Sequence, residues 1–442
     1  MNRPDPSAPL VDSVATGFDL PPTRPVWMTV ILFAVVVTVA AGFAHLFRVT
    51  SQGFLERYAD TSDPTRAAER LHWWVTFATV TGAVFVAAMV GRFVEQRWGD
   101  HVGVEAVSAS ARGEGRSISL RATGLRGAAT WVVSAGMVSI GRESAIIETG
   151  GAVGAVAGRR FRGRGDAMAT AGIAAAFAAA YHAPIAALFY VEEHLRVWSS
   201  RRAVLFAVLG AIGGHAVSVG LMDGHVIFPP IQGSQWRMIE MALIALLPSV
   251  IVARAFLQLR VRITGSTLSE RIGCQPWVVA AVLSVVAGGA VAVFPAAAGN
   301  GMEALRQASV AAPVSLGVAL GVGKLIGTTA SLGAGAPGGV LTPTISVTSG
   351  FSLLVLLALS SMGYGVEHPW DAMVATMAIG VAVGLRSPLV AVFLLPEMVG
   401  DYSLVPAIAV IVGLAVLVDR GLDRVVAALG ERIPVGVYDE DA

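Results

Sequence analysis

The chain has 442 residues, of which 55% are hydrophobic and only 14% are charged, and its formal net charge is +1. Because a soluble domain carries about 25% charged residues, this composition excludes an ordinary water-soluble protein. The near-zero net charge argues against nucleic acid as a partner. The single cysteine, Cys274, and the scattered histidines form no metal-ligand spacing, so we expect neither a metal nor a cofactor.

Two uninterrupted apolar stretches, about 27–47 and 73–94, follow a polar, proline-rich segment at 1–26. Helices of about 20 apolar residues cross the roughly 30 Å of hydrocarbon in a bilayer. Lipid forces the backbone to bond internally, and the alternation typical of barrel strands is absent, so these stretches are predicted helices. Residues 1–26 lack the basic start and cleavage site of a signal peptide, so the first helix is expected to be retained. The arginine distribution slightly favours a cytoplasmic N-terminus.

After a polar stretch at about 99–126, most apolar segments are short and interrupted by glycine. The predicted segments, in chain order, are 128–140, 145–158, 167–180, 184–191, 202–221, 237–257, 277–295, 314–332, 339–360, 371–385, 388–395 and 403–418. Residues 426–442 read as a polar tail. Short, broken hydrophobic segments in corresponding halves indicate an internal repeat with a binding site at the membrane midplane.

Three pairs of short motifs recur in the same order, each about 200 residues apart. The pairs are Gly103-Val104-Glu105-Ala106-Val107 with Gly301-Met302-Glu303-Ala304-Leu305, Gly141-Arg142-Glu143-Ser144 with Gly338-Gly339-Val340-Leu341, and His182-Ala183-Pro184 with Arg386-Ser387-Pro388. In the last pair, Glu193 and Glu397 each follow the proline by nine residues. The sequence therefore predicts two repeats, about 73–222 and 277–420.

Glu143 lies in a glycine turn, Gly141-Arg142-Glu143, between two apolar segments, where an ionisable residue is functional by default. A helix that begins there points free N–H groups and its positive dipole end at an anion. A carboxylate at that place would compete with the anion and act as a gate that leaves when protonated. The alternative is that Arg142 and Glu143 only anchor a loop.

Three further features each have a functional and a structural interpretation. Glu193, beside Glu192 at the end of an apolar run, either faces inward as a proton carrier or lies at the membrane interface. The glycine-rich run 333–343 either presents backbone amides to an anion or allows close helix packing. Lys324 is either a buried cation near that run or a side chain that extends to the interface.

In this order and over about residues 27–425, the segments resemble the CLC family of chloride channels and chloride/proton antiporters. Gly141-Arg142-Glu143 is similar to the family's gate motif, and residues 181–193 resemble its Asn-Ala-Pro…Glu-Glu segment. Residues 335–343 resemble the segment whose backbone amides coordinate the central anion. The resemblance implies an all-α polytopic membrane protein of two inverted repeats with tilted and broken helices. It also implies a homodimer in the cell (inner) membrane, with one anion pathway per subunit.

The resemblance further assigns roles to single residues. Glu143 would be the gating glutamate and Glu193 the internal proton-transfer glutamate. The expected anion-binding positions are Ser144, Ala145, Ile146, Val340, Leu341 and, at the approximate place of a family serine, His101. Two family donors are missing, because no serine lies at 99–105 and no tyrosine lies at 420–424.

Because both glutamates are present, the predicted function is exchange of chloride or a similar anion for protons, without enzymatic activity. A passive anion channel and a transporter for another anion, such as fluoride or nitrate, are alternatives, since the missing hydroxyls alter the site. A membrane-embedded hydrolase or transferase using Glu143, Glu193 and His182 lacks any nucleophile–base or metal-ligand spacing. A membrane scaffold would not need an ionisable residue beside a glycine turn.

Overall fold

In the computed structural model, the described residues are 26–112, 114, 117–159, 165–222, 226–263 and 265–428. They form helices and no named β-strand within these ranges, so the predicted all-α class is confirmed. Most of the two predicted polar ends, at 1–25 and 429–442, lies outside the described residues.

The N-terminal part contains α1 (Val26–Ala59), α2 (Pro64–Arg70) and α3 (Trp73–Trp98). The helix predicted at 27–47 is longer, because Ser51, Leu55 and Ala59 continue its buried face at four-residue spacing. Apart from these two long N-terminal helices, most of the membrane part consists of shorter helices.

The first repeat runs from α3 to α9. After α3 its elements are η1 (Gly99–His101), α4 (Val104–Ala111), α5 (Leu120–Ala135), α6 (Glu143–Arg159), α7 (Gly165–Tyr181), α8 (Pro184–Leu195), η2 (Val197–Ser199) and α9 (Arg201–Met222). The helix predicted at 128–140 begins eight residues earlier, because the Ser119 hydroxyl accepts the Ala122 N–H and caps α5.

The segment between the repeats differs from the prediction of one apolar stretch at 237–257. It forms α10 (Gln235–Ile244) and α11 (Leu246–Arg262), which meet at an angle of 62°, followed by α12 (Gly265–Ile272). Pro248, in the first turn of α11, explains the break. Its ring has no N–H, and in a continuous helix it would collide with the carbonyl group of Ile244.

The second repeat has the same order of helices. Its elements are α13 (Pro276–Val293), η3 (Pro295–Ala297), α14 (Met302–Val310), α15 (Val314–Val318), the π-helical η4 (Ala319–Gly323), α16 (Lys324–Ala334), α17 (Leu341–Ser361), α18 (Pro369–Gly384), α19 (Pro388–Val399), η5 (Tyr402–Leu404) and α20 (Val405–Ala428). The corresponding pairs are α3 with α13, α4 with α14, α5 with α15–α16, α6 with α17, α7 with α18, α8 with α19, and α9 with α20.

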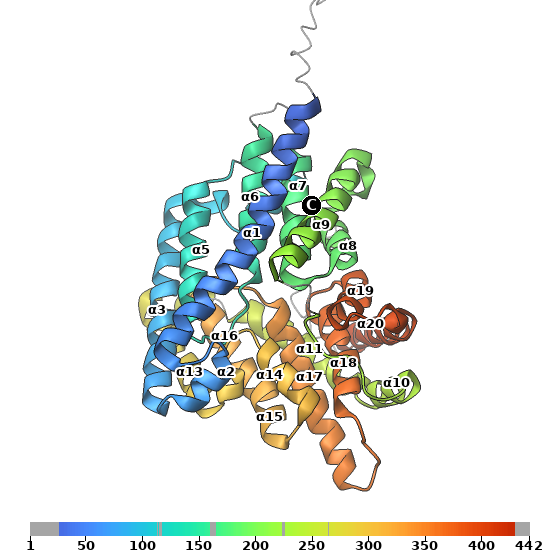
Figure 1. Ribbon diagram of the computed structural model, residues 1–442. Helices are drawn as coiled ribbons and strands as arrows, with labels where there is room; N and C mark the ends of the chain where they lie inside the picture. The colour runs from blue at the N-terminus through green and yellow to red at the C-terminus, as the bar shows by residue number, and fades with distance from the viewer. Residues whose placement is uncertain are drawn as a thin grey trace, which may run out of the picture.

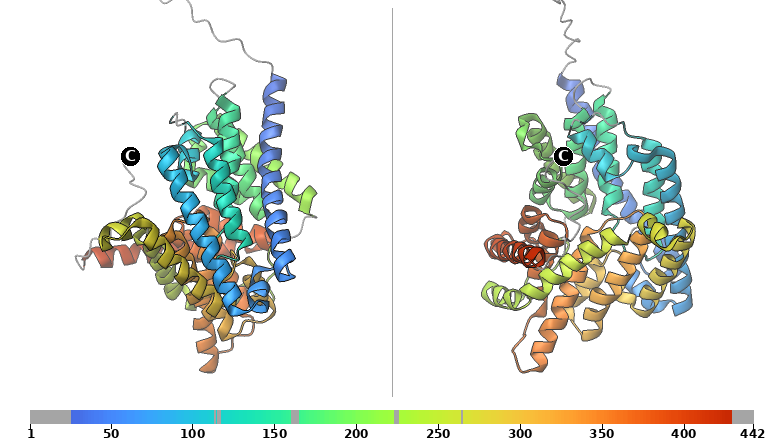
Figure 2. Two further views of the ribbon diagram at one scale, coloured as in Figure 1. Left: turned by 90° about the vertical axis from the view of Figure 1, so that its left-hand side faces the viewer. Right: turned by 180° about the vertical axis from the view of Figure 1, so that it is seen from behind.

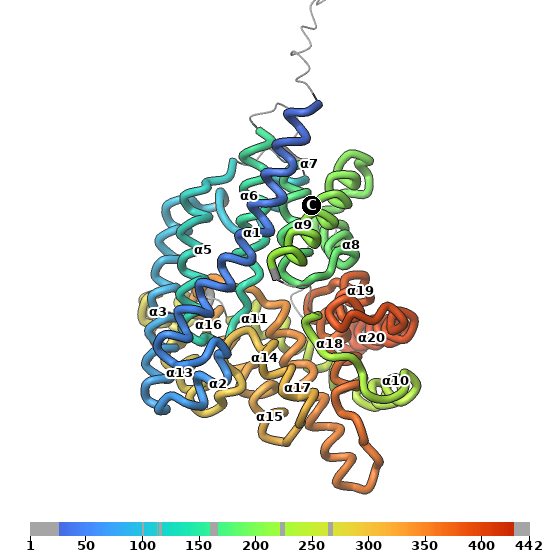
Figure 3. The backbone as a smooth tube through the Cα atoms, in the orientation of Figure 1, coloured from blue at the N-terminus to red at the C-terminus, as the bar shows by residue number. Residues whose placement is uncertain are grey.

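The later helices of the first repeat and the middle helices of the second lie in opposite parts of the molecule. The green helices α6–α9 lie in the upper half of Figure 1 and the orange helices α14–α17 in the lower half, and both views in Figure 2 show the same division. Helices α8 and α19 pack side by side where the halves meet (Figure 3). Helix α18 is buried along its whole length after Pro369. A short helix buried on all sides suits the centre of a membrane protein.

Seven helical stretches among the described residues are long and apolar enough to cross a membrane, and the bent pair α10–α11 would make an eighth. Several other helices, including α7, α18 and α19, are apolar but shorter. Half-length helices place their ends, and therefore their free backbone groups, inside the protein.

Candidate functional site

The two glycine-containing loops that precede α6 and α17 are joined by a reciprocal pair of backbone hydrogen bonds. The Gly141 N–H donates to the Gly339 carbonyl over 2.9 Å, and the Gly339 N–H donates to the Gly141 carbonyl over 2.6 Å. A Cβ atom on Gly141 would lie 2.7 Å from the Gly339 oxygen and still closer to the Glu143 carboxylate. Glycine is therefore required for the beginnings of α6 and α17 to meet.

Glu143 is the first residue of α6, and its side chain lies at this meeting point. The residue is 4% exposed. Its Oε1 accepts a hydrogen bond of 3.0 Å from Asn300 Nδ2, and its Oε2 accepts one of 3.2 Å from Thr342 Oγ1. The structure thus places residue 143 beside the 338–343 turn, as the transport hypothesis requires.

Asn300 was not identified from the sequence. Its Oδ1 accepts the Met302 N–H over 3.2 Å, which orients the amide so that Nδ2 faces Glu143. One signal in the sequence could have pointed to Asn300. It lies between Gly299 and Gly301, at the head of a helix that has a repeat partner. A polar residue in such a turn can reach a neighbouring loop, but the sequence alone does not say which one.

Lys324 supports the loop that carries Asn300. Its Nζ donates to the carbonyl oxygens of Ala297 and Gly299 over 3.0 and 2.8 Å. The side chain is fully buried, so the interpretation in which it extends to the membrane interface is wrong. A buried ammonium group is stable only with such partners, and here they fix the approach to Glu143.

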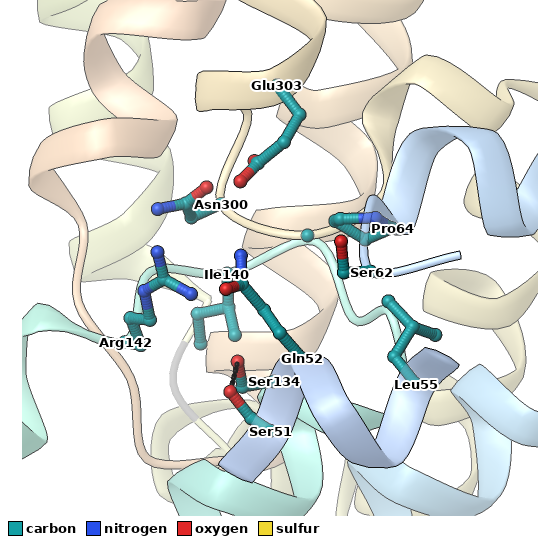
Figure 4. A pocket seen from close by; sticks show the side chains of 11 residues that line it. Ser51, Gln52, Leu55, Ser62, Pro64, Ser134, Ile140, Arg142, Asn300 and Glu303 are labelled. Carbon is teal, nitrogen blue, oxygen red and sulfur yellow. Dashed lines mark hydrogen bonds between the residues drawn. The ribbon is translucent and has the colours of Figure 1, made fainter. Parts of the chain in front are cut away.

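Two pockets share Arg142 and Glu303 in their lining, and Glu143 itself lines one of them. The first is lined by Arg48, Arg142 and Arg306 together with Glu143. The second, shown in Figure 4, has hydroxyl groups from α1 and α5 and the Asn300 amide, towards which the Arg142 side chain points. In the first pocket three guanidinium groups outnumber the carboxylates of Glu143 and Glu303, and such an excess of positive charge attracts small anions.

The predicted amide positions surround the same point. Ser144, Ala145 and Ile146 form the first turn of α6, Val340 is the N-cap of α17, and Leu341 is its first residue. The N–H groups of a first turn have no partner within the helix. The backbone nitrogens of Glu143 and Ser144 lie close to Gly339. The N-termini of α6 and α17, which are the positive ends of their dipoles, therefore point at the Glu143 carboxylate. Anion binding by these amides stays a prediction.

Glu193, on α8, lies at the first turn of α19. Its oxygens accept the N–H groups of Leu389 and Val390, in the first turn of α19, over 2.7 and 3.2 Å. In the other direction, Glu397 of α19 accepts the N–H groups of Ile185 and Ala186, in the first turn of α8, over 2.9 and 2.8 Å. Each helix begins with a proline, so the next two N–H groups are the ones that need a partner. The repeated Pro…Glu spacing thus makes a reciprocal pair of caps, and the predicted proton transfer by Glu193 stays untested.

His101 lies in η1 with an exposed side chain, and its Nδ1 lies 3.0 Å from both the carbonyl and the hydroxyl oxygen of Ser117. The contacts described for it do not connect it with Glu143. The structure therefore does not bring this predicted residue into the group around the carboxylate.

Comparison with known proteins agrees with this geometry. The profile of the family described as Voltage gated chloride channel matches residues 82–420. The chain belongs to this family. The CLC resemblance is thus confirmed, and with the spans described above the chain is a multi-pass protein of the cell membrane.

Curated relatives cover most of the chain. The voltage-gated ClC-type chloride channel ClcB of Escherichia coli O17:K52:H18 is 25% identical over 408 residues, which span 87% of this chain and 93% of the relative. ClcB of Citrobacter koseri is 26% identical over 396 residues, spanning 86% and 92%.

Two solved structures show the same fold. A slow cyanobacterial Cl⁻/H⁺ antiporter aligns with a TM-score of 0.72 at 18% identity, over 91% of this chain and 99% of that one. A CLC-type fluoride/proton antiporter aligns with a TM-score of 0.70 at 17% identity, over 90% and 96%. The predicted CLC-like arrangement of two inverted repeats is therefore confirmed at the level of the fold.

Proposed function

We propose that this CLC protein exchanges small inorganic anions, chloride first, for protons across the cell membrane, and that Glu143 is its gate. One observation carries the proposal: the buried Glu143 carboxylate occupies the point where α6 and α17 meet, at the end of an arginine-lined opening. A carboxylate, which carries the same charge as the anion when it is ionised, thus occupies the position best suited to bind that anion. Membership of the family supports the same function, and so do the structural neighbours, a Cl⁻/H⁺ antiporter and a fluoride/proton antiporter.

The exchange follows from the chemistry of this carboxylate. When ionised, it accepts the Asn300 and Thr342 hydrogen bonds, and hydrogen bonds to a charged acceptor are about twice as strong as neutral ones. A proton on either oxygen removes the charge and weakens the attraction to both helix beginnings. The side chain then leaves, and an anion takes its place on Thr342 and on the amides of Ser144 to Ile146 and Val340 to Leu341. Return of the side chain displaces the anion and releases the proton.

Few contacts bear on which anion the protein transports. The residues around Glu143 offer backbone amides, one amide side chain and one threonine hydroxyl, which bind any small anion. The serine and tyrosine expected from the family resemblance are absent, and one structural neighbour is a fluoride/proton antiporter. Fluoride and nitrate are therefore the competitors to compare with chloride, and a passive channel is the alternative mechanism.

A flux assay on purified protein in liposomes tests the proposal. Vesicles loaded with chloride are diluted into chloride-free buffer, and external chloride and external pH are recorded together after valinomycin has set the voltage. Exchange predicts that chloride efflux drives proton uptake, whereas chloride efflux without proton movement would show a channel. Adding fluoride or nitrate outside ranks the anions by competition. Vesicles without any anion flux would instead favour the hydrolase or scaffold alternatives.

We further propose that two copies of the chain form a homodimer with one pathway in each subunit. Light scattering of the detergent-solubilised protein, corrected for bound detergent, would give twice the mass of one chain. A monomeric mass that persists as the detergent concentration is lowered would contradict this part alone.

A further inference from the structure

A second buried carboxylate lies on the same helix as Glu143. Glu148, on α6, is 2% exposed. Its Oε1 accepts the Gly103 N–H over 3.0 Å, and its Oε2 lies 3.2 Å from Nε of Arg126. Five residues of α-helix separate the two glutamates, so Glu148 lies about 7.5 Å further along α6 and about 140° around it. The exchange described above makes no use of this group.

The internal repeat relates the partners of the two carboxylates. Gly103 is the N-cap of α4, and Gly301 is the N-cap of its repeat partner α14, next to Asn300. The head of α4 thus binds Glu148 through a backbone N–H, and the loop before α14 binds Glu143 through the side chain of Asn300, one residue before the position that corresponds to Gly103.

Glu148 lies on the opposite side of Glu143 from the arginine-lined pockets. Those pockets are lined by the second half of α1, whereas α6 runs from Glu143 towards the face of the molecule where α1 begins (Figures 1 and 2). The side chain of Arg126 is 26% exposed, and that of Glu148 is 3% exposed. Arg126 is therefore the more exposed member of the pair.

Few other charges act on Glu148. Helix α6 packs against α1, α4, α5 and α7. Arg126 comes from α5. On α4, Glu105 is paired with Arg112. The described side chains of α7, at 167–181, include no charged residue, and Arg48 of α1 lines the pocket at the Glu143 end. The charge of Glu148 is thus balanced by Arg126 and by the head of α4.

We propose that Glu148 is a second gate operated by protons, on the side of Glu143 opposite to the arginine-lined pockets; this inference rests on the proposed function. The ionised carboxylate accepts hydrogen bonds from the Gly103 N–H and from Arg126. In this position it closes this end of the pathway. A proton that binds to a carboxylate oxygen from that side neutralises the group. The N–H and the guanidinium group are then available to an anion. The pathway consequently has one carboxylate at each end, and each carboxylate competes with the same anion.

The test uses a Glu143→Gln background, in which the first gate cannot titrate. Chloride efflux from liposomes is measured between about pH 7 and about pH 4.5, the range in which carboxylates take up protons. We expect efflux through E143Q to rise several-fold as the pH falls. We expect E143Q/E148Q to give the raised rate at every pH, because the amide oxygen introduced at position 148 still accepts the Gly103 N–H without the charge.

The matched control is E143Q/E105Q, which neutralises an exposed, arginine-paired carboxylate on α4. It should keep the pH dependence of E143Q. The inference is overturned if E143Q/E148Q titrates like E143Q, or if the rate through E143Q does not change with pH. Absence of chloride flux in the unmutated protein would overturn the proposed function as well, so the two failures are distinguishable.

Discussion

Asn300 donates a hydrogen bond of 3.0 Å to the carboxylate of Glu143, from a loop 157 residues away along the chain. The bond connects the head of α14 in the second repeat with the head of α6 in the first. It lies inside the protein and stabilises the seated position of the carboxylate, most strongly when the acceptor is ionised.

Replacing Asn300 by alanine should loosen this gate. A hydrogen bond to a charged group contributes about 1.5–3 kcal/mol, so the equilibrium between seated and released Glu143 should shift by roughly tenfold or more towards release. We expect faster chloride efflux at neutral pH and a weaker increase on acidification. Gln307→Ala, which removes an amide side chain from α14, the helix that follows the Asn300 loop, is the control and should behave like the unmutated protein. Slower or unchanged efflux in N300A would show that Asn300 does not hold the gate.

Gly141→Ala tests the contact between the two loops. The new methyl group would lie 2.7 Å from the backbone oxygen of Gly339, and backbone cannot move away as a flexible side chain can. We expect α6 and α17 to separate and both chloride and proton flux to fall. Gly289→Ala, on α13, meets no atom within 4 Å and should keep transport unchanged, with stability raised by up to about 1 kcal/mol because alanine is the better helix former. Equal transport by the two variants would contradict the role given to Gly141.

The sequence was sufficient for the general fold and for part of the site. The glycine-interrupted segments and the three repeated motifs predict the repeats, and an ionisable residue in an apolar region identifies Glu143. The bend between α10 and α11 was missed, although Pro248 was a visible signal. Asn300 and the reciprocal caps of Glu193 and Glu397 could not be placed, because their contacts join residues 157 to 212 positions apart. Such contacts depend on how the repeats pack, which local patterns do not contain.

Glu193→Gln distinguishes a structural role from the predicted proton transfer. The side-chain amide of this variant can accept only one of the two N–H groups at the head of α19, and it lacks the charge that favours a helix N-terminus. If the residue is chiefly a cap, stability falls by about 2 kcal/mol, seen as a lower Tm in detergent, while the ratio of protons to chloride is kept.

Glu397→Gln provides the comparison for this experiment, because Glu397 caps α8 in the same way. We expect both variants to lose stability, whereas Glu240→Gln, on α10, should lose less, because Glu240 bonds the side chains of Arg237 and Tyr364 and caps no helix. A stable E193Q protein with a reduced ratio of protons to chloride would instead support proton transfer by Glu193.

The central claim is that a proton moves only when it is bound to the carboxylate of residue 143. The most direct test records chloride and pH together in liposomes containing Glu143→Gln. We expect chloride efflux to continue, since the neutral amide no longer holds the anion's place, and proton uptake to fall to the level of protein-free vesicles. Proton uptake that still follows chloride efflux in this variant would contradict the account.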